Sequence, residues 1–173
     1  MKSFIRTLLA AGLASASSPW ALAHVTLERT QAPADSYYKA VLQVPHGCKS
    51  SPTVALRVRI PEGVTSVKPQ PKPGWKLTIA RASLAQPLDA GHGRMVSERV
   101  SEVAWSGGSL PDEYFDEFKM MMKLPDRPGA TLYLPVVQEC KDGVTRWIET
   151  PDGGKPASDL KEPAPALQLT PKQ

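Results

Sequence analysis

The sequence has few cysteines, few aromatic residues and no long apolar run. Aromatic residues make up 6% of its 173 residues, and the basic residues are scattered rather than gathered in runs. The formal net charge is only +4, and two of the basic residues, Lys2 and Arg6, fall in a segment that we expect to be removed. A nucleic-acid surface needs clustered cations, and a membrane span needs about 20 apolar residues. We therefore expect neither a nucleic-acid partner nor a transmembrane anchor.

Residues 1–23 have the layout of a secretory signal peptide. Lys2 and Arg6 form a positive start, and residues 8–13 form a short apolar stretch. Ala21-Leu22-Ala23 then places small side chains at the two positions that signal peptidase reads. Cleavage is predicted between Ala23 and His24, with a site one or two residues away as the alternative. The sequence thus predicts an exported protein whose mature chain begins at His24.

Alternating apolar and polar residues predict strands, and almost nothing indicates a helix. In residues 54–60, Val54, Leu56, Val58 and Ile60 share one face, which is typical of a half-buried strand. The 18 prolines suit short strands between fixed turns. We expect one all-β domain over residues 24–152, an antiparallel β-sandwich of the immunoglobulin type or a related one. The predicted strands are Tyr37–Val44, Val54–Ile60, Trp75–Ala80, Met95–Trp105, Tyr114–Leu124, Thr131–Gln138 and Val144–Thr150.

The last residues, 153–173, differ in composition from the rest. They are rich in Pro, Lys, Ala and Asp and show no clear period. Such a segment has little apolar surface to bury, so we expect a loosely ordered tail.

The two cysteines, Cys48 and Cys140, form an even set in a chain that we expect to be exported. The first expectation is one structural disulfide, which by closing a loop of about 100 residues contributes on the order of 4–5 kcal/mol. The alternative is a pair of thiolate ligands for copper(I). The absence of a CxxC spacing and the oxidising compartment favour the disulfide.

His24 gains unusual chemistry if cleavage follows Ala23. It then carries a free α-amine and an imidazole on one residue, and the amine and Nδ1 can close a six-membered chelate ring on a metal. Both kinds of nitrogen lose their protons within reach of neutral pH, and copper(II) prefers nitrogen ligands in a square plane. The alternative is that a histidine stands there by chance.

Two further residues are candidates for this site. Strand alternation in residues 114–124 places Glu117 away from the core, and in residues 144–150 it places Trp147 beside polar neighbours, with Val144 and Ile148 facing inward. A carboxylate adds an anionic ligand, and an indole excludes water. The alternatives are a solvated carboxylate and a ring that covers the edge of the sandwich.

The remaining histidines and the methionines are weaker candidates. His92 lies in a Gly-His-Gly loop and is the best source of a second imidazole, whereas His46 is expected to belong to the turn at Cys48. Residues 120–122 are three consecutive methionines, but neighbours on a strand point to opposite faces and cannot chelate together. We expect Met120 and Met122 in the core and Met121 outside it.

Several short motifs, spread over nearly the whole chain after residue 23, together carry a resemblance to a known family. They are His24-Val25-Thr26, Pro45-His46-Gly47-Cys48, Ser51-Pro52-Thr53, Pro73-Gly74-Trp75, Phe115-Asp116-Glu117-Phe118, Leu134-Pro135-Val136-Val137-Gln138, Asp142-Gly143 and Trp147. Together they resemble the YcnI-like copper-binding domain of exported bacterial proteins. The resemblance implies one copper(II) ion per chain, bound by the amine and imidazole of His24 and by Glu117, beside Trp147. Glu113 and Asp112 are alternative carboxylates.

The resemblance also implies a freely diffusing periplasmic protein that buffers copper or delivers it to a partner, such as another periplasmic chaperone or a membrane copper transporter. A copper oxidase resembling the polysaccharide monooxygenases is a second hypothesis. Those enzymes use a second histidine, for which only His46 and His92 are available, so we expect no enzyme activity. A third hypothesis is an adhesive or structural β-sandwich without metal.

Overall fold

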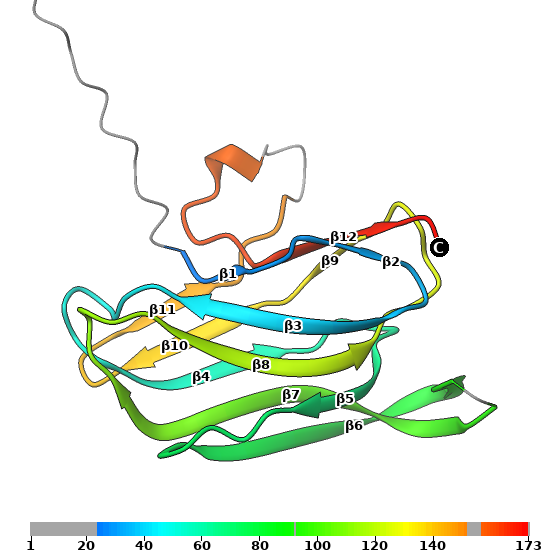
Figure 1. The fold of residues 1–173 in the computed structure, drawn as a ribbon, viewed down its shortest axis with the longest axis horizontal. Helices are drawn as coiled ribbons and strands as arrows, with labels where there is room; N and C mark the ends of the chain where they lie inside the picture. Colours follow the sequence, from blue (N-terminus) through cyan, green and yellow to red (C-terminus); the bar gives the residue numbers. More distant parts are fainter. Residues whose placement is uncertain (1–23, 92, 152–156, 173) are drawn as a thin grey trace, which may run out of the picture.

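The computed structural model describes residues 24–91, 93–151 and 157–172 (Figure 1). The predicted signal peptide, including Ala23, and the loop histidine His92 lie outside the described residues.

The described chain is all-β, as the sequence predicts. A four-stranded sheet has the order β1-β3-β8-β5, a five-stranded sheet has the order β11-β10-β4-β7-β6, and a three-stranded sheet has the order β2-β12-β9. All strand pairs are antiparallel except β12 with β2. Figure 1 shows the four-stranded sheet crossing in front of the five-stranded one. The bounds are β1 Thr26–Leu27, β2 Gln31–Pro33, β3 Tyr37–Val44, β4 Thr53–Arg59, β5 Thr65–Pro69, β6 Lys76–Asp89, β7 Met95–Leu110, β8 Asp116–Lys123, β9 Thr131–Tyr133, β10 Val136–Cys140, β11 Val144–Trp147 and β12 Ala166–Thr170, with one 3-10 turn at Ala157–Asp159.

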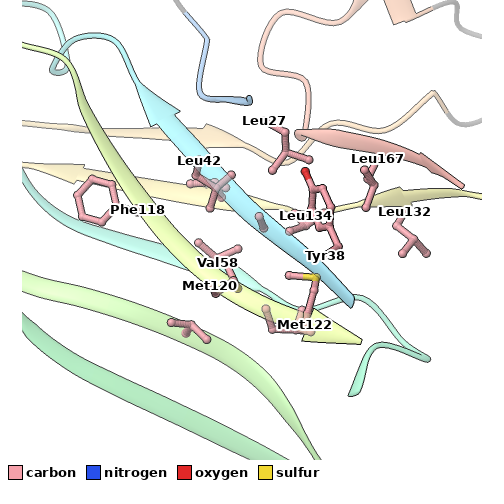
Figure 2. Close-up of a cluster of buried hydrophobic side chains, with 14 of the residues drawn as sticks. Leu27, Tyr38, Leu42, Val58, Phe118, Met120, Met122, Leu132, Leu134 and Leu167 are labelled. Atoms are coloured by element: carbon pink, nitrogen blue, oxygen red, sulfur yellow. The ribbon is translucent and has the colours of Figure 1, made fainter. Parts of the chain in front are cut away.

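The core fills the space between the two larger sheets. Leu42 of β3 and Phe118 of β8 extend from one sheet toward Val58 of β4 in the other (Figure 2). Met120 and Met122 are buried, and the intervening Met121 is 40% exposed, so the alternation predicted for this strand is confirmed. Each fully buried side chain of this size contributes about 1.5–3 kcal/mol. The amphipathic pattern of the sequence therefore accounts for the sandwich.

Several strands differ in extent from the prediction. The predicted strand at residues 131–138 is two strands, β9 and β10, because Pro135 has no amide N–H to continue the ladder and Leu134 pairs with Pro165. Strands β6 and β7 are longer than expected and form a hairpin that projects beyond the sandwich (Figure 1). Most of β6 is exposed or half-exposed on both faces, so no alternation marks its full length.

The expectation of a loose tail over residues 153–173 is wrong for residues 166–170. Residues 166–170 form β12, the middle strand of the three-stranded sheet, and Leu167 and Leu169 are buried in the common core. These two leucines alternate over only five residues, between segments rich in proline and lysine, and the surrounding composition hides them. The compact domain therefore does not end at residue 152.

The predicted disulfide between Cys48 and Cys140 is confirmed. The two Cα atoms lie 5.9 Å apart, and both residues are buried. The bond joins the segment after β3 to the end of β10, across a sequence separation of 92 residues. It thereby ties the two larger sheets together at one end of the sandwich.

Candidate functional site

The structure brings His24 and Trp147 into contact. Their ring centroids lie 5.1 Å apart, with an angle of 54° between the ring planes. His24 lies just before β1, at the edge of the four-stranded sheet, and Trp147 ends β11, at the edge of the five-stranded sheet. These two edges approach each other in Figure 1, so residues distant in sequence meet where the sandwich closes.

Trp147 faces the interior, which corrects the orientation predicted for β11. The indole is 5% exposed and belongs to the hydrophobic core, whereas Val144 and Ile148, predicted to face inward, are 50% and 45% exposed. The large ring takes the inward face of a short edge strand, and the smaller apolar residues are left outside. The indole Nε1 donates a hydrogen bond of 3.0 Å to Oε1 of Gln138 inside the protein.

Glu117 lies two strands away from β1. Across the four-stranded sheet, Thr26 is opposite Gln43, and Gln43 is opposite Glu117, so these three residues share a face. Two strand spacings separate Thr26 from Glu117 by roughly 10 Å. The carboxylate of Glu117 lies 2.7 Å from Nζ of Lys119, and it lines a separate depression with Lys72 and Asp116.

The charge of Glu117 is stabilised where it lies. Its bond to Lys119 lowers the pKa of the Glu117 carboxyl, against a smaller opposing effect of burial, and Gln43 lowers it further. The side chain is therefore an anion near neutral pH, as a metal ligand must be. To bind a metal at His24, however, it has to leave Lys119.

The two alternative carboxylates differ in their surroundings. Oδ1 of Asp112 accepts a hydrogen bond of 2.8 Å from the amide of Gly47, which fixes Asp112 to the segment before Cys48. A side chain at Gly47 has no room, since a Cβ there would lie 1.9 Å from the carbonyl oxygen of Ser51. Glu113 is exposed in the turn before β8.

His46 lies in the segment after β3 and is linked to Trp147 through the amide of Gln138. The carbonyl oxygen of His46 accepts a hydrogen bond of 2.7 Å from Gln138, and its ring Nδ1 lies against the carbonyl of Gly47. His46 therefore belongs to the turn at Cys48, as expected. His92, the other candidate for a second imidazole, lies outside the described residues.

A groove of about 430 Å³ adjoins His24 and has no other ionisable lining residue. Within the described ranges, no group of three or more histidine, cysteine, aspartate or glutamate side chains is placed to hold a metal ion. The imidazole of His24 therefore adjoins a groove that has no other ionisable lining residue, and it lies against a buried indole. The groove is lined by His24, Val25, Thr26, Leu27, Thr30, Gln31, Thr131, Pro163, Ala164, Pro165, Ala166 and Gln168.

Sequence reasoning assigned no role to Gln138. It stands in the motif at residues 134–138, and the alternation of that strand puts it on the same face as Val136. A glutamine at an inward position is the signal that could have identified it, because a buried amide needs hydrogen-bond partners.

The fold and this site define a class of protein: an immunoglobulin-like β-sandwich, closed by one disulfide, with a histidine against a tryptophan at the meeting sheet edges. The chain belongs to the family described as a domain of unknown function (DUF1775), whose model matches residues 24–169. That match extends through most of β12 and agrees with the corrected domain boundary.

A solved structure supports the same fold. It is an uncharacterized protein from Nocardia farcinica described as having an immunoglobulin-like fold, with 28% sequence identity and a TM-score of 0.64. The alignment covers 85% of this chain and 98% of that one. A search of curated proteins found no match. In the part of the chain that the structure describes, no helix is long and apolar enough to cross a membrane.

Proposed function

We propose that the protein is a periplasmic copper(II)-binding protein that buffers copper or delivers it to a chaperone or a membrane transporter, without turnover of its own. The observation that carries the proposal is the contact between His24, the first residue after the expected cleavage site, and the ring of Trp147. The motifs shared with the YcnI-like copper-binding domain support it, and the confirmed disulfide is in keeping with an extracytoplasmic compartment.

The donor chemistry at His24 fits copper(II). After cleavage the residue supplies an amine nitrogen and an imidazole nitrogen, both of which suit this ion. Trp147 limits the access of water on one side, since its ring is buried and its N–H is bonded inside the protein. Copper is the cargo in this proposal: the two nitrogens of His24 would hold the ion, and a partner would withdraw it.

The third donor is a carboxylate, and Glu117 is our first choice. It is anionic and shares the sheet face of Thr26, but it is held by Lys119. Glu113, exposed in the turn before β8, is the alternative that breaks no ion pair found in the described structure. Asp112 is the least suited, because the amide of Gly47 already occupies its Oδ1.

A titration with a competing chelator tests the proposal. A protein that begins at His24 should bind one copper(II) per chain more than about 100-fold more tightly than the same protein with one alanine before His24. An added residue converts the amine of His24 into an amide, whose nitrogen lone pair is delocalised into the carbonyl group and is a poor metal ligand. Loss of a ligand should exceed the roughly 10–100-fold effect of changing a residue that supports a metal site without touching the ion. Equal affinities would contradict the proposal.

The same titration identifies the carboxylate. Glu117→Gln should weaken copper binding, and Glu113→Gln should leave it unchanged. The opposite pattern would move the assignment to Glu113. Either substitution removes one negative charge, so each serves as the control for the other.

A further inference from the structure

Gln138 is a polar side chain buried between the sheets. It is 1% exposed and stands on the inward face of β10, between Val136 and Cys140. Burying an amide without partners costs about 1–3 kcal/mol, so its hydrogen bonds decide whether this position is tolerable. No buried side-chain nitrogen or oxygen in the described structure lacks a partner, and Gln138 follows that rule.

The amide of Gln138 is bonded at both of its ends. Oε1 accepts from the indole Nε1 of Trp147 at 3.0 Å. Nε2 donates to the carbonyl oxygen of His46 and to Oγ1 of Thr53, each at 2.7 Å. Turning the amide over would set its NH2 group against the indole N–H and its oxygen against the His46 carbonyl. The three partners therefore allow one orientation only.

The partners of this amide connect two parts of the molecule. On one side is Trp147, whose ring lies against His24. On the other side are His46 and Thr53, which flank Cys48. Oγ1 of Thr53 lies 3.8 Å from Sγ of Cys140, so the bonded chain ends beside the disulfide.

We propose that Gln138 is the positioning residue of the candidate copper site. Its amide fixes the direction of the indole N–H of Trp147, and this fixes the ring plane that His24 meets. The amide is itself held by the segment that the Cys48–Cys140 bond closes. Where the inference concerns copper it rests on the proposed function, but the positioning of Trp147 is a property of the metal-free protein.

The substitution Gln138→Met tests the inference, because methionine has a similar length and no hydrogen-bonding amide. In the metal-free protein that begins at His24, the ring-proton resonances of His24 should shift, since they sense the nearby indole ring. Hydrogen exchange of the Trp147 indole N–H should become at least about tenfold faster. Trp147→Phe identifies that resonance among the tryptophans. Gln86→Met, the same change on the projecting hairpin, should alter neither.

Copper affinity gives a second readout. Gln138→Met should weaken binding by about 10–100-fold, the usual effect of changing a residue that supports a metal site without touching the ion. The double variant Gln138→Met with Trp147→Phe should lose no more copper affinity than the weaker-binding single variant, because Gln138 acts through the indole. Additive losses of affinity would overturn the inference.

The two proposals fail in different ways. If the wild-type protein binds no copper while Gln138→Met still shifts the His24 resonances, the proposed function fails and the positioning role stands. Unchanged His24 resonances and indole exchange in Gln138→Met would overturn the positioning role. If this variant does not fold, hydrogen exchange in the wild-type protein tests the positioning role instead. Rapid exchange of the Trp147 indole N–H would contradict a buried bond to Gln138.

Discussion

Single side chains in this molecule have properties set by what surrounds them, and Tyr38 is the clearest case. It is almost fully buried on β3, and burial raises the pKa of its phenol to about 12. An unfolded tyrosine ionises near pH 10. The folded state therefore keeps Tyr38 neutral over an interval of pH in which the unfolded chain has lost that proton.

Stability should fall with rising pH because of this residue. Below about pH 10 both states are protonated, and the contribution of Tyr38 is fully present. Between about pH 10 and pH 12 only the unfolded state ionises, so the free energy of unfolding should drop by up to about 2.7 kcal/mol. Absorbance titration of the phenols should show one late component. Tyr38→Phe should abolish it, and Tyr114→Phe, at an exposed position, should not. A single transition near pH 10 would contradict this.

The residue scale also shows which features of the residues around His24 could be predicted from the sequence. His24 and Trp147 were predicted as neighbours, and the structure places their rings in contact. The orientation of Trp147 was wrong, because alternation in a four-residue edge strand is too short to fix which face is buried. Gln138 received no role, since its inward position indicates that the buried amide needs partners but does not indicate which residues they are.

At the scale of elements, strands with one buried face were predictable and the others were not. Strand β3 has the bounds expected from its alternation. Strand β6 is exposed on both faces for most of its length, and β12 is only five residues long. The first has no contrast between its faces, and the second has too few residues to stand out from its surroundings. Pairing with β2 and β9, rather than local propensity, defines β12.

The burial of β12 leads to a prediction about stability. Leu167→Ala should lower the free energy of unfolding by about 2–5 kcal/mol, because the side chain is fully buried and its removal leaves a cavity. Leu84→Ala, in the projecting hairpin outside the core, should cost less than about 1 kcal/mol. Urea unfolding of both variants measures the difference. If Leu167→Ala left the free energy of unfolding unchanged, the expectation of a loosely ordered tail would stand.

At the scale of the whole molecule, the disulfide connects two sheets that otherwise meet through side chains. It spans a sequence separation of 92 residues, so its removal frees most of the chain in the unfolded state. Replacing both cysteines with serine should lower the free energy of unfolding by up to about 4–5 kcal/mol. Urea unfolding of the double variant and of the oxidised wild type measures the difference in the free energy of unfolding. Equal midpoints would show that the bond adds nothing.

The parallel pairing of β2 with β12 joins the first part of the described chain to its last strand. In the export that we propose, the N-terminal part of the chain crosses the membrane first. Strand β2 then has to wait for its neighbour until almost the entire chain has been translocated. The three-stranded sheet can therefore close only after its last strand is available, and a chain interrupted before residue 166 leaves β2 and β9 without their strand partner in this sheet.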